Sequence, residues 1–379
     1  MASKWIVAVS LILVVALAGC GGSNTSSNQP APPASGGTPP PSIGSFTEQT
    51  PSGTAGNLVG EALVQLSDGS ILVAGGDNQT ISPGFNFTSA AEVLSLDASG
   101  TVVVTKVGNM TVARDIPGVV RMPDGRVLVV GGRGASDTPL ATAEIYDPQA
   151  KSFSATGTML HQRLAPAMFV LKDGTIVVIG GDIGTIPQET GEIYNPATGT
   201  FGSLFSIPSA VGMGSRSIAM LIDGRILFPG GSNNGTAVAT AQIFDPQSRA
   251  FTPTGNMTSA RSGPTVTTLA DGKVLVAGGV NGGALASAET YDPATGTFSA
   301  TGNMTEALTN PISIRLSSGK VLVVGDNSRT SELYDPSTRT FTAGAQMITQ
   351  VTFGQLFLMP DGTVLLTRGP SFPFEFFHP

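Results

Sequence analysis

Short apolar runs alternate with turn residues along most of the chain. Two clear examples are FVLKDGTIVVIGG at 169–181 and TTLADGKVLVAGG at 267–279. In each, one apolar run leads to Asp-Gly and a second run ends in Gly-Gly. This pattern predicts two strands joined by a hairpin, and Asp-Gly is typical of a type I′ turn with positive φ at both central residues. Because polar residues do not alternate within the runs, we expect both faces of these strands to be buried.

The same unit recurs seven times. The turn doublet, Asp-Gly or once Ser-Gly, begins at Asp68, Asp124, Asp173, Asp223, Asp271, Ser318 and Asp361. After Gly-Gly come a third strand, such as AEIYDP at 143–148, and a fourth, such as FSATGNM at 298–304. No helical pattern is present to cover the sheets, so neighbouring copies must cover them. The repeat therefore predicts an all-β, seven-bladed β-propeller with four antiparallel strands per blade, spanning residues 44–379.

The repeated residues resemble the kelch motif. The resemblance rests on the Gly-Gly doublet, the Tyr-Asp-Pro of the third strand and the aromatic residue of the fourth. It implies the propeller of the galactose-oxidase and kelch superfamily. The Trp usual on the fourth strand of that motif is replaced by Phe153, Phe201, Phe251, Phe298 and Phe341.

The two ends of the repeat region predict how the ring closes. FEFFHP at 374–379 aligns with a third strand, so the last copy has no fourth strand after it. GSFT at 44–47 aligns with the fourth-strand sequence GTFS. We therefore expect the N-terminal strand to join the C-terminal blade, which hides the edges of an open ring.

Residues 1–20 have the features of a secretory signal. Lys4 precedes an apolar run that is too short to span a bilayer. The run ends in LAGC at 17–20, which resembles a bacterial lipobox and implies lipidation of Cys20. Residues 21–43 are rich in Pro, Gly and Ser and carry no charge, which predicts a tether. We expect a protein anchored in the bacterial envelope by this lipid, in the outer membrane, facing the periplasm or the cell surface.

Composition narrows the protein class further. The chain has 49 Gly and 27 Pro, and 12% of its residues are charged, which argues against a mainly helical protein. A formal net charge of −7 argues against a nucleic-acid partner. Cys20 is the single cysteine, so no intramolecular disulfide can form. We expect a monomer.

Variable loops after Gly-Gly and the crossings between blades share one face, where we expect binding. One glutamate recurs on the third strand of each blade, except that blade four has Gln242, which indicates a framework role. Arginines open the first strands of blades two to five, which predicts a basic side to the channel mouth. We expect three of them to pair with the glutamate of their own blade. Arg216 would remain for an anionic ligand, such as the carboxylate of a sugar acid.

The candidate ligand-binding residues are therefore Arg216, Arg114, Arg163, Arg261 and Asp115. Weaker candidates on the same face are Arg133, Asp182 and Arg329. His161 lies beside Arg163 at a blade crossing, where a surface role and a general-base role are both open.

The sequence lacks the residues that a copper oxidase of this superfamily would need. The superfamily resemblance implies a copper site of two His, two Tyr and a Tyr–Cys crosslink, whereas the sequence offers only His161 and His378, and Cys20 is assigned to lipid. We expect no copper-radical oxidase, no metal site, no cofactor and no catalytic residues.

Two functions stay open. One is a binding or scaffold module for an envelope protein or a glycan. The other is a non-metal enzyme resembling periplasmic kelch sugar-acid mutarotases, which would need a carboxylate and an arginine at the channel mouth. Those enzymes have six blades, whereas this chain has seven copies.

Overall fold

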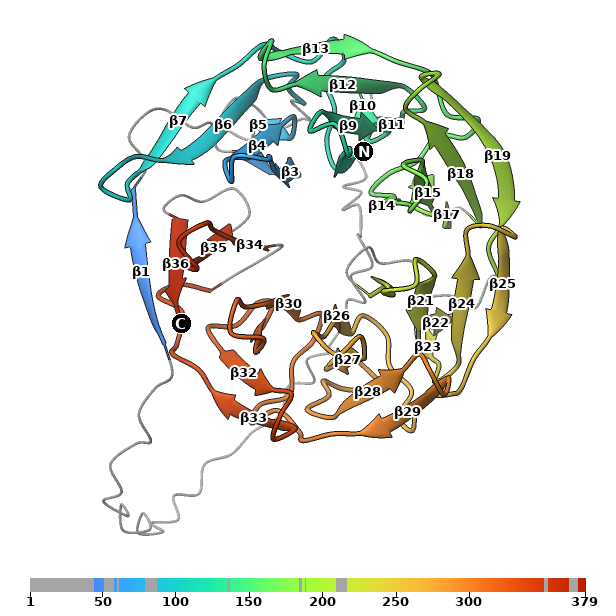
Figure 1. The fold of residues 1–379 in the computed structure, drawn as a ribbon, viewed down its shortest axis with the longest axis vertical. Coiled ribbons are helices and arrows are strands. Elements are labelled where there is room, and N and C mark those ends of the chain that lie inside the picture. Colours follow the sequence, from blue (N-terminus) through green and yellow to red (C-terminus); the bar gives the residue numbers. More distant parts are fainter. Residues whose placement is uncertain are drawn as a thin grey trace, which may run out of the picture. The chain divides into compact units, whose positions relative to one another are not determined.

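The computed structural model folds the repeat region into seven four-stranded antiparallel sheets arranged in a ring (Figure 1). The structure describes residues 44–50, 58–59, 61–78, 87–134, 137–183, 186–187, 189–208, 217–350, 354–367 and 374–379. The predicted signal, Cys20, the tether and Arg216 lie outside these residues. Among the residues described, no helix is long and apolar enough to cross a membrane.

Each sheet is one blade, and its strands follow one another from the centre of the ring outward. Blades one to three are β3 (Ala62–Gln65), β4 (Ile71–Ala74), β6 (Ala91–Leu96) and β7 (Val102–Lys106); β8 (Gly118–Arg121), β9 (Val127–Val130), β12 (Ala143–Asp147) and β13 (Ser152–Ala155); and β14 (Ala167–Val170), β15 (Ile176–Ile179), β18 (Thr190–Asn195) and β19 (Thr200–Ser206). Blades four to six are β20 (Ala219–Met220), β21 (Ile226–Pro229), β24 (Ala241–Asp245) and β25 (Ala250–Pro253); β26 (Thr265–Thr268), β27 (Val274–Ala277), β28 (Ala288–Asp292) and β29 (Thr297–Ala300); and β30 (Ile312–Arg315), β31 (Val321–Val324), β32 (Ser331–Asp335) and β33 (Thr340–Ala343). Blade seven is β34 (Gln355–Leu358), β35 (Val364–Thr367), β36 (Phe374–His378) and β1 (Ser45–Gln49). The predicted all-β, seven-bladed architecture is confirmed.

The core lies between neighbouring blades. The second strand of every blade is buried at all four positions, as its continuous apolar run predicts. Leu72 and Ala74 of β4, for example, share a cluster with Val127 and Val129 of β9. The first strands, such as β8, are less buried, and they lie nearest the centre of the ring (Figure 1). Burial on both faces therefore holds for the second strands and only partly for the first.

The Asp-Gly hairpins differ from the predicted type I′ turn. Only the glycine of each doublet has positive φ, for example +87° at Gly69. Gly69 N–H donates to Leu66 O (3.2 Å), and Leu66 N–H donates to Ser70 O (2.7 Å). The loop thus has three residues, a type I turn followed by a left-handed glycine. Asp68 occupies the turn because its carboxylate accepts a hydrogen bond from Ser70 N–H (3.0 Å).

The ring closes as the repeat predicts. β1 pairs antiparallel with β36, with Ser45 opposite His378 and Gln49 opposite Phe374. In Figure 1 the N-terminal strand lies beside the C-terminal strand at the outer edge of blade seven. The rings of Phe46 and Phe377 lie 5.2 Å apart between centroids. Both ends of the repeat region therefore contribute to one sheet.

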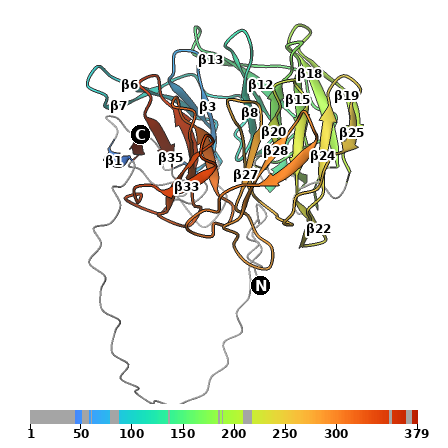
Figure 2. The ribbon, with the colours of Figure 1, turned by 60° about the horizontal axis from the view of Figure 1, so that its bottom comes forward.

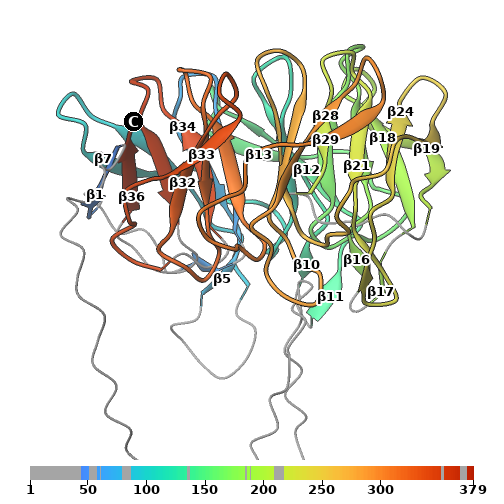
Figure 3. The same ribbon diagram turned by 90° about the horizontal axis from the view of Figure 1, so that it is seen from below.

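The blades carry different connections at their two ends. The Asp-Gly hairpins and the turns between third and fourth strands lie at one end, here called the turn face. The Gly-Gly loops and the blade crossings lie at the other end, here called the loop face. Four two-stranded ribbons extend the loop face: β2 (Leu58–Val59) with β5 (Asp77–Asn78), β10 (Arg133–Gly134) with β11 (Thr138–Pro139), β16 (Asp182–Ile183) with β17 (Ile186–Pro187), and β22 (Ser232–Asn233) with β23 (Thr236–Ala237). Figures 2 and 3 show these ribbons projecting from one side of the ring.

Candidate functional site

A glutamate on the third strand holds the chain that crosses from the preceding blade. Glu144 accepts hydrogen bonds from the backbone N–H groups of Thr111 (2.7 Å) and Val112 (3.2 Å). The equivalent pairs of bonds are made by Glu192, Glu289 and Glu375. The framework role predicted for the repeated glutamate is therefore confirmed in these four blades.

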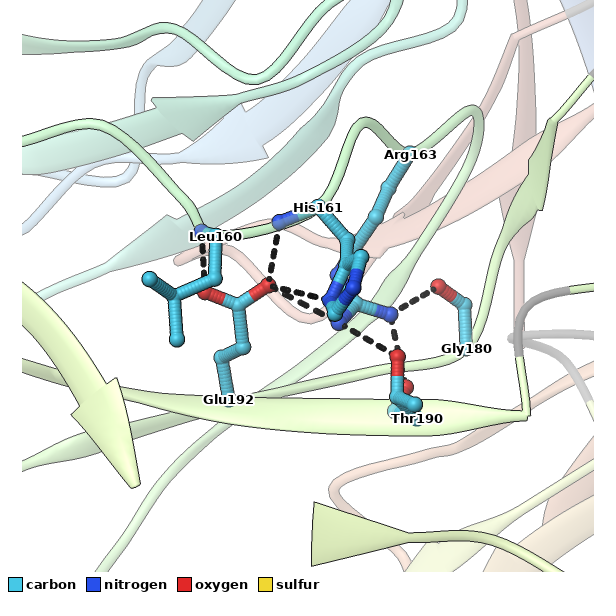
Figure 4. Close-up of polar contacts among 6 residues, drawn as sticks. All are labelled: Leu160, His161, Arg163, Gly180, Thr190 and Glu192. Carbon is cyan, nitrogen blue, oxygen red and sulfur yellow. Dashed lines mark hydrogen bonds and ion pairs between the residues drawn. The ribbon is translucent and has the colours of Figure 1, made fainter. Parts of the chain in front are cut away.

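Arg163 completes this arrangement in blade three (Figure 4). Its Nη2 lies 2.9 Å from Glu192 Oε1, and its Nη1 donates to the carbonyl oxygens of Gly180 (2.9 Å) and Thr190 (2.6 Å). The side chains of Arg163 and Glu192 have no exposed surface. Burial lowers the pKa of the guanidinium, and the hydrogen bond that it donates to Glu192 opposes that effect. The side chain therefore stays in place as part of a buried ion pair.

Two more predicted ligand-binding arginines have the same surroundings. Arg114 lies 2.8 Å from Glu144, and Arg261 lies 3.2 Å from Glu289. Neither guanidinium is exposed. The expectation that three arginines pair with the glutamate of their own blade is confirmed. Arg114, Arg163 and Arg261 therefore serve the framework and present no surface to a ligand.

Arg216 does not occupy the position of those arginines in the repeat. Arg114, Arg163 and Arg261 lie ten residues before the aspartate of the hairpin, whereas Arg216 lies seven residues before Asp223. Blades two, three, five and six have Pro at the latter position, blade seven has Gly354, and blade one has Glu61. The repeat therefore aligns Arg216 with Glu61, and Arg216 itself lies outside the described residues.

Asp115 and Arg133 come together on the loop face. Their backbones exchange two hydrogen bonds, Asp115 N–H to Arg133 O (2.9 Å) and the reverse (2.8 Å). The same backbone pairing joins Leu164 to Asp182 in blade three, where the side chains cannot form an ion pair. In blade two, Arg133 Nη2 lies 2.5 Å from Asp115 Oδ2. The structure thus brings together Asp115, one of the main ligand-binding candidates, and Arg133, one of the weaker ones.

Arg133 has two further contacts. Its Nη1 lies 3.1 Å from Asp137 Oδ1. Its guanidinium carbon lies 5.1 Å from the ring centroid of Phe87, within the range of a cation–π contact. Arg133 is 9% exposed, so Asp115, Asp137 and Phe87 hold its guanidinium in a fixed position. Phe87 adds an apolar surface beside a cluster of hydrogen-bonding groups.

Glu61 is a further residue of this region, which the sequence analysis missed. It directly precedes β3, the innermost strand of blade one. Burial, together with the charge of Asp115, raises its pKa from 4.5 to about 7. Burial and the charge of Asp77 likewise raise the pKa of Asp115, against the effect of Arg133. The available signal was the acidic residue at a repeat position where blades two, three, five and six have Pro.

The charge of the channel mouth differs from the prediction. A basic side was expected, but Arg114, Arg163 and Arg261 are buried inside the blades, and Arg216 lies outside the described residues. Within the described part of the loop face, Glu61, Asp77, Asp115 and Asp182 outnumber Arg133 in blades one to three. Burial raises the pKa of Asp182 as well. This side of the mouth is therefore acidic.

The histidines do not fit a copper site. His161 lies at the crossing into blade three, where its Nδ1 is 3.9 Å from Glu192 Oε1. His378 ends β36 in blade seven, where its Nε2 is 2.8 Å from Thr47 Oγ1. The two side chains thus belong to different parts of the ring, His161 to the crossing into blade three and His378 to blade seven. Among the residues that the structure describes, no three His, Cys, Asp or Glu side chains are grouped to hold a metal ion.

Comparisons with known proteins support the architecture. The kelch motif family matches residues 119–160 and 260–305, which lie in blades two and five. A solved structure described as a novel fungal alcohol oxidase of the AA5 family, in complex with copper, is similar with a TM-score of 0.69 and 18% identity. That match covers 89% of this chain and 76% of the oxidase. The structure of YjhT is similar with a TM-score of 0.54 and 13% identity, covering 76% of this chain and 97% of YjhT.

No curated protein matches the chain. At these identities the structural matches concern the fold alone. The seven closed blades and the motif in blades two and five agree with each other. The chain is a seven-bladed β-propeller that carries the kelch motif in blades two and five.

Proposed function

We propose that the protein is a binding module of the bacterial cell envelope that takes a glycan or a protein partner on its loop face. The observation that carries the proposal is the set formed by Glu61, Asp115, Arg133 and Phe87 in blades one and two. It combines a carboxyl group that is partly protonated near neutral pH, a fixed guanidinium and an aromatic face. Such a combination of a few placed polar groups with an apolar surface is typical of small-ligand sites.

A glycan array tests the binding function. We expect wild-type protein to retain a defined set of glycans, and Arg133→Met to lose them. Arg126→Met is the matched control, because Arg126 pairs with Asp124 in an exposed hairpin on the turn face. A silent array with a captured envelope protein in a pull-down would assign the site to a protein partner. Equal binding by the Arg133 and Arg126 variants would refute the site.

The anchor is part of the same proposal and rests on the sequence. LAGC at 17–20 and the uncharged segment 21–43 support lipidation of Cys20 and attachment by a tether. Cys20→Ser should abolish incorporation of labelled palmitate and release the protein from the membrane fraction. Unchanged fractionation of this variant would contradict a lipid anchor.

A second function is favoured by one specific observation. A non-metal enzyme acting on a sugar acid needs a carboxyl group and an arginine at the channel mouth, and Glu61 and Arg133 supply these types in adjacent blades. A carboxyl with a pKa of about 7 can donate and accept a proton at neutral pH. Interconversion of sugar-acid anomers followed by NMR tests this alternative. Catalysis that is lost in Glu61→Gln while binding persists would favour the enzyme over the binding module.

A further inference from the structure

Glu332, the third-strand glutamate of blade six, has no arginine partner. In blades two, three and five, the equivalent glutamate pairs with an arginine of its own blade. The residue at the arginine position of blade six is Leu308, whose side chain has no charge. Glu332 is nevertheless fully buried, and among the described residues its Oε2 has no hydrogen-bond partner. Because a buried carboxylate without a compensating charge is costly, a cation beside Glu332 would stabilise the fold.

The other oxygen of Glu332 holds the crossing from blade five. Glu332 Oε1 accepts hydrogen bonds from Thr305 Oγ1 (2.8 Å) and from the backbone N–H of Glu306 (2.9 Å). In blade three, by contrast, backbone N–H groups bond to both oxygens of Glu192. The hydrogen bonds of Glu332 are therefore gathered on one oxygen, and the other oxygen is left for a ligand.

A second carboxylate comes to the same place. Thr330 Oγ1 donates a hydrogen bond to Glu306 Oε2 (2.6 Å). Thr330 is the counterpart of Thr190, because each lies two residues before the glutamate of its blade. In blade three, Arg163 Nη2 lies 3.0 Å from Thr190 Oγ1 and 2.9 Å from Glu192 Oε1 (Figure 4). Glu306 therefore contacts the hydroxyl that faces a guanidinium in blade three.

The repeat position of Glu306 explains this approach. Its counterpart in blade three is His161, whose Nδ1 lies 3.9 Å from Glu192 Oε1 (Figure 4). A side chain at this position thus comes close to the third-strand glutamate. The basic residue next to Thr330 in sequence faces elsewhere, since Arg329 Nε donates to Met347 O (2.6 Å) at the crossing into blade seven. Two carboxylates therefore meet in blade six where blade three has a carboxylate and a guanidinium.

The remaining blades without this arginine differ from blade six. Glu92 of blade one is the register partner of Lys106, which supplies a positive charge from the fourth strand. Blade four has the uncharged Gln242. Glu375 of blade seven accepts a backbone N–H with each of its two oxygens. Among the third-strand glutamates of the described blades, Glu332 is thus the one with a buried oxygen that has no partner.

We propose that the junction of blades five and six binds one calcium ion, held by the carboxylates of Glu306 and Glu332 and by the hydroxyl of Thr330. The ion takes the place of the guanidinium of the other blades, and its two positive charges balance the two carboxylates. All these ligands are oxygen atoms, which calcium prefers, and water completes the coordination. Glu306 is exposed, so the ion reaches the site from the loop face. The proposal departs from the expectation of no metal site.

Calorimetric titration of the full chain with calcium chloride tests this site. We expect one ion per chain with a Kd of about 0.1–1 mM, the range of extracellular calcium modules. Glu306→Gln should weaken binding at least about tenfold, because it removes one of the two charged ligands. Glu189→Gln is the matched control, because Glu189 is an exposed carboxylate of the loop face in blade three, and it should leave the affinity unchanged.

A variant that supplies the missing guanidinium gives a second test. Leu308→Arg reproduces in blade six the arginine, glutamate and hydroxyl that occur together in blades two, three and five. We expect this variant to lose calcium binding, because the guanidinium occupies the site. Calcium at about 10 mM should raise the Tm of the wild-type protein by about 2 °C and leave the Tm of Leu308→Arg unchanged.

Three results would overturn the proposal. The first is a wild-type protein that does not bind calcium. The second is equal calcium affinity in Glu306→Gln and Glu189→Gln, which would place the ion elsewhere, such as the acidic mouth of blades one to three. The third is tighter binding of magnesium than of calcium. If Leu308→Arg does not fold, the comparison of the two surface variants still decides.

Discussion

The buried ion pair of blade three offers a direct measure of how the blades are held together. Replacing Arg163 with Met keeps most of the apolar volume and removes four hydrogen bonds, to Gly180 O, Thr190 O, Thr190 Oγ1 and Glu192. Glu192 then remains buried as a charge with two backbone donors. Removing one partner of such a pair costs about 3–5 kcal/mol. In blade six, Glu332 is buried with Leu308 at the arginine position, so the framework tolerates a glutamate without its arginine. We therefore expect Arg163→Met to lower the free energy of unfolding by about 3 kcal/mol, the lower end of this range.

Urea unfolding followed by circular dichroism and fluorescence measures the effect. Arg126→Met is the control, because the Arg126–Asp124 pair is exposed and contributes at most about 1 kcal/mol. The double variant Arg163→Met, Glu192→Gln should recover about 1–2 kcal/mol, since the buried charge is removed and the backbone N–H groups keep an acceptor. A loss for Arg163→Met no larger than that for Arg126→Met would refute the reasoning.

Three further predictions follow from the fold. Deleting residues 44–50 removes β1 and should lower the Tm by several degrees, measured by calorimetry; an unchanged Tm would contradict the closure. Gly191→Ala should destabilise the protein by about 1–3 kcal/mol in urea, because a Cβ there would lie 2.1 Å from the Phe205 ring; a neutral result would show that the ring can move. Glu61 has a raised pKa, so the folded protein binds more protons than the unfolded chain between about 4.5 and 7, and stability should fall as pH rises through that window. Glu61→Gln should remove this slope, seen as a smaller change in urea midpoint between pH 5 and pH 8; an identical slope would assign it to other groups.

The repeat itself could be predicted because its residues are selected by local geometry. Asp-Gly and Gly-Gly occur where the backbone needs a left-handed residue, and each apolar run has the length of one strand. The turn type could not be derived from the doublet alone. The same Asp-Gly serves two-residue and three-residue loops, and the choice depends on the residue before it and on cross-strand register. Gly69 N–H bonding to Leu66 O decides it here.

The candidate site could be predicted less well, because it depends on contacts between blades. The pairing of arginine with glutamate followed from their recurrence, one of each in blades two, three and five. The role of Arg216 stays a prediction, because this residue lies outside the described part of the chain, and it is three residues closer to the turn than the other arginines are. Glu61 was missed because its raised pKa arises from burial and from Asp115 in the next blade. Contacts between residues of adjacent blades depend on how the blades pack in the ring, so the sequence of one blade does not predict them.

β1 pairs with β36 in the same register as a fourth strand that is joined to its third strand by an ordinary turn. In blade five, four residues separate Asp292 from Thr297, which are register partners, and the last of the four is Gly296 with φ of +69°. His378 and Ser45 are register partners too, and Gly44, with φ of +85°, directly precedes Ser45. Linking Pro379 to Gly44 through Ala-Thr would therefore give His-Pro-Ala-Thr-Gly-Ser, the counterpart of Asp-Pro-Ala-Thr-Gly-Thr in blade five. A circular permutant with this two-residue linker could begin in any other blade, so the chain can be cut elsewhere in the ring while the same seven sheets form.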